Sequence, residues 1–181
     1  MTSKNIKDKN IIADMLQGMI DKDQKAINKK PVDKEEVKQI MIANRKTVRS
    51  IVKEHGLISF SKFGEKASFN AWLLIQHFPK TSIRFMEKYL DMMEKAKGDV
   101  NLKNLAYLQD RVNVYKGNPQ VYGTQLYAKK GSEICEFRTM KNISKVDELR
   151  KGVGLEKLSE YVKSFEEISG NKAILPEGYK E

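Results

Sequence analysis

The feature that most constrains this chain is a helical spacing of apolar residues that recurs along most of its 181 residues. Apolar residues at intervals of three and four line one face of a helix, and such faces must be buried against one another. The pattern covers about residues 5–29, 33–56, 64–78, 81–98, 101–116 and 155–168, with a short helix at 146–151. The sequence therefore predicts a mainly α fold, a single-domain, bundle-like array of helices.

Local sequence signals mark the ends of these helices and a short segment that is not helical. Asp33 and Glu36 have the spacing of a capping box, and Gly56 is a typical helix stop. Gly117-Asn118-Pro119 ends the helical pattern, after which residues 120–127 and 133–139 are rich in β-favouring residues and flank Lys129-Lys130-Gly131. We predict one small β-hairpin near residues 120–139, one domain over residues 1–169, and a loose tail over 170–181.

Composition excludes several classes of protein. The longest apolar run, residues 71–75, is far shorter than the roughly 20 residues that cross a bilayer, and no apolar stretch follows the charged N-terminus as in a secretory signal. We therefore expect a cytoplasmic protein with no membrane association. A single cysteine, Cys135, and two histidines cannot form a disulfide framework or an all-nitrogen-and-sulfur zinc site. No metal is expected, and no cofactor is indicated.

The net charge of +10 favours an anionic partner, because summed positive charge attracts phosphates. Lysines nevertheless alternate with acids, as in Lys22-Asp23 and Lys34-Glu35-Glu36, and form no basic block. This pattern is typical of a solvated lysine-rich surface. We expect a small anionic or polar ligand and no sequence-specific binding of nucleic acid. The oligomeric state is not indicated.

Polar residues interrupt the helical pattern at two places. His77 falls on the side of its helix opposite the apolar face, in a strip with Lys66 and Asn70 that reads as solvated. Asp110 and Arg111 lie at the edges of buried surface on the helix at 101–116. Neighbours in sequence do not face each other on a helix, so each of these charges needs its own partner. Arg111 lies between Tyr107 and Tyr115. As an alternative to binding a ligand, it could stack between these two rings.

The first predicted strand carries polar groups on both faces. Gln120, Tyr122 and Thr124 share one face, and Gln125 lies on the other. Gly123 inside a strand marks a bulge or a close approach of another backbone or a ligand. The alternative interpretation is a wet edge hairpin with no site.

Three blocks of sequence resemble a bacterial family of domains of unknown function, family 6624. They are residues 64–77, ending in Gln76-His77; residues 106–112 followed by Gly117, Gln120 and Tyr122-Gly123-Thr124-Gln125; and residues 146–161. The early part departs from the family. The family has an aromatic residue after the equivalent of His55-Gly56, whereas this sequence has Leu57. The family's Asp-Gln before a basic residue appears as Asp23-Gln24-Lys25. The resemblance implies no reaction, but it does imply a shared pocket of Gln76, His77, Asp110, Arg111, Gln120, Tyr122, Thr124 and Gln125.

These residues lead to two hypotheses. In the first, the chain binds a small ligand: Arg111 holds an anionic or carbonyl oxygen, the Gln, Thr and Tyr side chains orient the ligand, and His77 with Asp110 is the candidate acid/base pair. In the second, the same groups bind a nucleotide-like ligand or a protein partner without catalysis. Cys135 and Thr124 lack an activating neighbour in sequence, so covalent catalysis is not expected. Whether the protein is an enzyme stays open.

Overall fold

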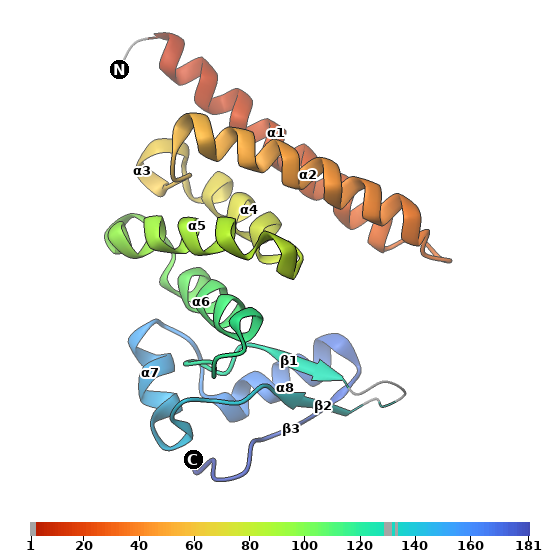
Figure 1. Ribbon diagram of the computed structural model, residues 1–181, viewed down its shortest axis with the longest axis vertical. Helices are drawn as coiled ribbons and strands as arrows, with labels where there is room; N and C mark the ends of the chain where they lie inside the picture. Colours follow the sequence, from red (N-terminus) through yellow and green to blue (C-terminus); the bar gives the residue numbers. More distant parts are fainter. Residues whose placement is uncertain (1–2, 129–131, 133) are drawn as a thin grey trace. The chain divides into compact units, whose positions relative to one another are not determined.

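The computed structural model describes residues 3–128, 132 and 134–181 (Figure 1). In these residues the chain forms eight α-helices, three short 3-10 helices and a three-stranded sheet, so the predicted mainly α fold is confirmed. Contacts group the chain into two compact units, Met1–Asn101 and Leu102–Glu181. One domain over residues 1–169 stays a prediction.

The first unit begins with two long helices, α1 (Ser3–Ile27) and α2 (Lys34–His55), which run side by side in opposite directions (Figure 1). Asp33 caps α2, because its carboxylate accepts hydrogen bonds from the backbone N–H groups of Glu35 and Glu36 at 3.0 and 3.1 Å. Gly56 ends the helix with a positive φ of 74°, and its N–H donates to the carbonyl of Val52 at 2.9 Å. Both predicted ends of this helix are confirmed.

The rest of the first unit packs against this pair. It consists of α3 (Phe60–Phe63), α4 (Glu65–Gln76), the 3-10 helix η1 (Lys80–Ser82), α5 (Ile83–Lys95) and the 3-10 helix η2 (Lys97–Asp99). The core includes Leu16 of α1, Val48 of α2, Ile75 of α4 and Met86 of α5, each at most 1% exposed. The helix predicted over 64–78 ends at Gln76, two residues before Phe78, where Pro79 disfavours the α conformation.

The second unit joins three helices to the small sheet. Its elements are α6 (Leu102–Lys116), β1 (Leu126–Ala128), β2 (Ile134–Phe137), the 3-10 helix η3 (Ile143–Lys145), α7 (Val146–Gly152), α8 (Leu158–Ser169) and β3 (Lys172–Ile174). β1 pairs with β2 antiparallel, with Tyr127 opposite Glu136, which confirms the hairpin. Its predicted turn at Lys129-Lys130-Gly131 lies outside the described residues.

The segment expected to be a loose tail contributes β3 to the sheet. β3 pairs with β2 in parallel, so that the strand order is β1-β2-β3. Ala173 in β3 also donates its N–H to the carboxylate of Glu166 at 2.9 Å. Further on, the Tyr179 hydroxyl donates to the Asp147 carboxylate at 2.7 Å. These contacts tie the C-terminal segment to α7 and α8.

The predicted strand over residues 120–127 is wrong for residues 120–125. These residues form a loop, with a single bridge from Gln120 to Met140, and regular pairing begins only at Leu126. Gly123 has a φ of +64°, and a Cβ there would lie 2.9 Å from Cε of Met140 and 3.0 Å from Cδ1 of Leu158. Hydrogen bonds from side chains to the backbone of this loop outweigh the preference of its residues for β structure.

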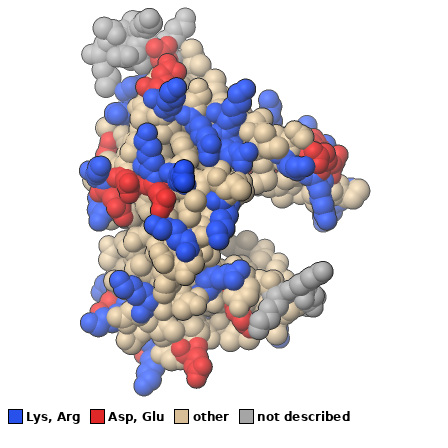
Figure 2. All heavy atoms as spheres, in the orientation of Figure 1, with Lys and Arg blue, Asp and Glu red and all other residues tan. Residues whose placement is uncertain are grey.

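The surface of the described residues is rich in positive charge. Figure 2 shows Lys and Arg side chains spread over the visible face among other residues. None of the helices in residues 3–128 and 134–181 is both long enough and apolar enough to span a membrane.

Candidate functional site

Asp110 of α6 holds the loop of residues 120–125 in the second unit. The side chain is fully buried, and its carboxylate accepts hydrogen bonds from the N–H groups of Val121, Tyr122 and Thr124 at 2.6, 3.2 and 3.0 Å. The Thr124 hydroxyl donates to it at 3.0 Å. Burial raises the pKa of Asp110, while these hydrogen bonds act to lower it. The predicted acid/base residue therefore has four protein donors on its carboxylate.

Two of the three glutamines of the predicted site, Gln120 and Gln125, close the same loop. The Gln120 side chain donates to the carbonyls of Gln125 and Arg138 at 3.1 and 2.7 Å and accepts the Gln125 N–H at 2.9 Å. The Gln125 side chain donates to the Thr124 hydroxyl at 2.9 Å. The structure thus brings Asp110, Gln120, Thr124 and Gln125 together, where they bind one another and the backbone.

Arg150 of α7 completes this network, and the sequence analysis did not single it out. Its fully buried guanidinium donates to the carbonyls of Tyr122 and Gly123 at 2.7 and 3.2 Å, and its Nε donates to the carbonyl of Glu156 at 2.5 Å. It also lies 5.0 Å from the ring centre of Tyr161. The available signal was its spacing of four from Val146, which places it on the buried face of α7.

Arg111 is the other charged residue of the predicted set in the second unit, and its side chain is half-buried. Its guanidinium carbon lies 5.9 Å from the ring centre of Tyr115, so it stacks on one of the two predicted tyrosines. Its Nε is buried and has no hydrogen-bond partner among the described residues. Anion binding by Arg111 stays a prediction.

Gln76 and His77 belong to the first unit. Gln76 is the last residue of α4 and is 4% exposed, while the His77 side chain is 42% exposed. The prediction that Lys66, Asn70 and His77 form a solvated strip is partly wrong. Asn70 is buried and donates to the Gln17 side chain at 3.0 Å. Helix α1 covers that part of α4, which the spacing within α4 does not reveal.

The carboxylate beside His77 is that of Asp23 on α1. Nδ1 of His77 lies 4.0 Å from Oδ2 of Asp23, whose side chain is only 6% exposed. A small cleft beside this pair also includes Asn44, whose buried Nδ2 has no hydrogen-bond partner among the described residues. His77 and Asp110 lie in different units, so their action as a pair stays a prediction. In the described part of the chain, no three His, Cys, Asp or Glu side chains gather as a metal site.

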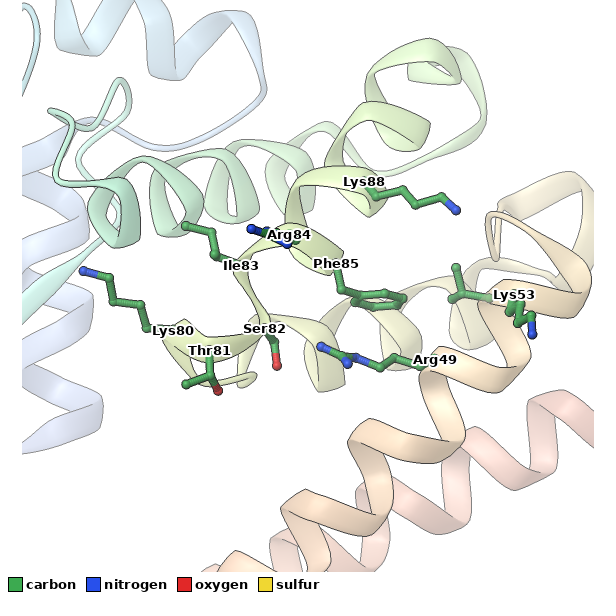
Figure 3. Close-up of a pocket in the computed structure, with 10 residues that line it drawn as sticks. Arg49, Lys53, Lys80, Thr81, Ser82, Ile83, Arg84, Phe85 and Lys88 are labelled. Atoms are coloured by element: carbon green, nitrogen blue, oxygen red, sulfur yellow. The ribbon is translucent and has the colours of Figure 1, made fainter.

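A separate cavity of about 580 Å³ in the first unit is lined by cations (Figure 3). We call it the basic pocket. The described residues that line it include no Asp or Glu, and none of its cations has a carboxylate within salt-bridge distance in the described chain. The lining residues are Arg49, Val52 and Lys53 of α2 together with Lys80, Thr81, Ser82, Ile83, Arg84, Phe85 and Lys88 of η1 and α5.

A buried hydroxyl without a partner lies in this pocket at the start of α5. Ser82 is 2% exposed and occupies the N-cap position, yet its side chain makes no capping hydrogen bond, and its Oγ has no partner among the described residues. In Figure 3 the Arg49 guanidinium extends from α2 toward this hydroxyl. Arg49 also lies 5.3 Å from the ring centre of Phe85. The positive end of the α5 dipole adds to the field of the cations.

The sequence analysis missed the basic pocket, although a signal for it exists. Lys80, Arg84 and Lys88 recur at intervals of four, as do Arg49 and Lys53. This spacing places Arg49 and Lys53 on one face of α2 and Arg84 and Lys88 on one face of α5, whereas Lys80 lies in η1. It cannot show that the two faces lie against the same cavity.

Residues 15–174 match the family of unknown function DUF6624. The chain belongs to this family. The DUF6624 match includes the Asp23 and His77 contact, the basic pocket and the network of Asp110 and Arg150. No curated protein and no solved structure matches the chain significantly. Membership of DUF6624 brings no reaction with it, so the function has to be argued from the sites themselves.

Proposed function

We propose that this protein binds a small anion with more than one negative charge, of the phosphate ester or diphosphate class, in the basic pocket. The observation that carries the proposal is a cavity with five cationic side chains and no carboxylate in its lining. The cavity volume of about 580 Å³ falls within the range of about 300 to 1,000 Å³ that is typical of small-ligand sites.

The chemistry of the lining favours phosphate oxygens. Arg49 and Arg84 present planar forks of N–H donors that match two oxygens at once, whereas the lysines supply mobile point charges. The ring of Phe85 lies beside the Arg49 guanidinium and restrains its position. The Ser82 hydroxyl, buried without a partner, gains a hydrogen bond when an oxyanion is present.

The number of cations argues for a multiply charged ligand. A single carboxylate neutralises one charge, and it would leave the other cations of the pocket repelling one another. Two or more negative charges compensate that repulsion more fully. The net charge of +10 also raises the rate at which such anions reach the surface.

Calorimetric titration of pyrophosphate into the full chain at low salt tests the proposal. Arg49→Gln should weaken binding by about tenfold or more, since a hydrogen bond to a charged group contributes about 1.5 to 3 kcal/mol. Ser82→Ala should weaken binding by a smaller factor while leaving the fold intact, because its hydroxyl has no partner to lose.

The matched control is Lys22→Gln, which removes one exposed positive charge from α1 outside the pocket. It should leave pyrophosphate affinity nearly unchanged. If Lys22→Gln and Arg49→Gln weaken binding equally, the anion is attracted by the general surface charge and the pocket is not its site. Absence of measurable binding by the wild-type chain at low salt would also refute the proposal.

Catalysis on the bound anion is a second candidate, favoured by the contact between His77 and Asp23. Nδ1 of His77 lies 4.0 Å from the buried carboxylate of Asp23, and an imidazole beside a carboxylate is a common arrangement in general acid/base sites. The phosphate released from pyrophosphate measures this activity. His77→Ala should abolish turnover but retain affinity for pyrophosphate, whereas a protein that only binds shows no turnover in either form.

A further inference from the structure

A second hollow, of about 490 Å³ and mainly apolar, lies along α2. We call it the α2 groove. Its apolar lining residues are Val32, Val37, Met41, Ile42 and Pro79, and its cations are Lys34, Lys38 and Arg45. Val32 and Ile42 are 48% and 43% exposed. Neighbouring apolar side chains that face the solvent in this way can mark a binding surface.

The α2 groove and the basic pocket have neighbouring lining residues on two elements. Arg45 of the groove and Arg49 of the pocket are one helical turn apart on α2, where side chains at this spacing are neighbours about 5–6 Å apart. On the other wall, Pro79 of the groove is bonded directly to Lys80 of the pocket. A single ligand can therefore occupy both hollows.

Cations predominate along this surface, although Lys38 pairs with Glu35 at 3.3 Å. Lys34, Lys38, Arg45, Arg49 and Lys53 follow one another at intervals of four, seven, four and four, which places them on one face of α2. The described lining residues of the α2 groove include no acid, and neither do those of the basic pocket. A second copy of this cationic face is a poor occupant, because like charges would be brought together.

We infer that the ligand is a single-chain amphiphile, with a phosphate-class head in the basic pocket and an apolar chain in the α2 groove. This inference rests on the proposed function for the head. The chain part rests on the apolar lining of the groove and on the adjacency of its lining residues to those of the pocket. Each methylene moved from water into the groove should raise affinity by about fourfold.

The probes are inorganic phosphate, octyl phosphate and octyltrimethylammonium, titrated into the full chain below the concentrations at which they form micelles. Octyl phosphate should bind at least about tenfold more tightly than phosphate, since only a few methylenes need to be buried. Octyltrimethylammonium carries the same chain on a cationic head and should bind at least about tenfold more weakly than octyl phosphate.

Two exposed isoleucines provide a matched pair of variants. Ile42→Gln should remove most of the difference between octyl phosphate and phosphate while leaving phosphate affinity unchanged. Ile11→Gln alters an isoleucine of α1 that is 51% exposed and lies outside the groove lining, so it should change neither affinity. Both positions are on helix surfaces, where a polar residue is tolerated.

The outcomes separate the two proposals. If phosphate binds and octyl phosphate binds no more tightly, the amphiphile inference is wrong and the anion site stands. If neither binds, both fail. Equal binding of octyl phosphate and octyltrimethylammonium would overturn the head assignment. The remaining alternative is a membrane surface: it is indicated, and the inference overturned, if Ile42→Gln weakens sedimentation with phosphatidylglycerol vesicles but leaves octyl phosphate affinity unchanged.

Discussion

Asp110 and Arg150 hold opposite polar groups of one loop. The Asp110 carboxylate accepts the N–H groups of Val121, Tyr122 and Thr124, and the Arg150 guanidinium donates to the carbonyls of Tyr122 and Gly123. Both side chains are fully buried. Two charges from different helices therefore satisfy the backbone of a segment that has almost no regular pairing. This arrangement explains why residues rich in β-favouring types remain a loop.

Removal of the Arg150 charge should destabilise the protein strongly. Arg150→Met keeps an unbranched side chain but leaves buried carbonyls without donors, so we expect a loss of about 3 to 5 kcal/mol in the free energy of unfolding. Urea denaturation followed by circular dichroism measures it. Lys151→Met, at the next and exposed position, should change stability by no more than about 0.5 kcal/mol. Equal effects of the two substitutions would show that the loop network contributes little.

Gly123→Ala should cost more than Gly117→Ala in the same assay. Both glycines have positive φ, at 64° and 81°, so either substitution strains the backbone by about 1 to 2 kcal/mol. An added Cβ at Gly123 would also meet side-chain atoms of Met140 and Leu158. A Cβ at Gly117 would have no neighbouring atom of the described residues within 4 Å. The difference between the two variants measures this steric clash. A smaller loss for Gly123→Ala would mean that the neighbouring side chains move aside freely.

Stability should fall as the pH rises above about 10, in part through Tyr107 and Tyr161. Burial raises the pKa of both hydroxyls above the ordinary value of 10.0. Above that pH the unfolded chain loses these protons while the folded chain keeps them, so the free energy of unfolding decreases. Urea midpoints at pH 8 and pH 11 test the sign. Tyr161→Phe should reduce the decrease, and a decrease as large as that of the wild type would exclude Tyr161 as a source.

Association with nucleic acid should be non-specific and strongly weakened by salt. Along the sequence, most Lys and Arg residues alternate with acids and form no basic block, and no recognisable DNA- or RNA-binding motif is present. Fluorescence anisotropy with DNA and RNA of unrelated sequences, over a range of salt concentrations, measures this. Arg111→Ala removes one charge among 34 Lys and Arg residues and should barely change the result. Sequence-selective binding at physiological salt, lost in Arg111→Ala, would contradict this interpretation.

The helices were predictable because the signals that define them are local. Asp33 and Gly56 fix the ends of α2 through hydrogen bonds to residues within four positions, and Pro79 limits α4 through its own geometry. The hairpin was likewise predicted from composition, although its first strand was placed too early. The strand was wrongly predicted over residues 120–125, where the backbone bonds to side chains of α6 and α7. A local sequence pattern does not reveal such distant partners.

The sequence by itself determined the helix faces, the positive charge and the family blocks, because periodicity and composition depend only on neighbouring residues. Only the tertiary structure decided which group meets each polar side chain. His77 lies beside Asp23, Asp110 binds a loop that follows its own helix, and Arg49 shares a cavity with Ser82. The physical reason is that helical spacing tells which face a residue occupies, whereas the element that covers that face is chosen by packing of the whole unit.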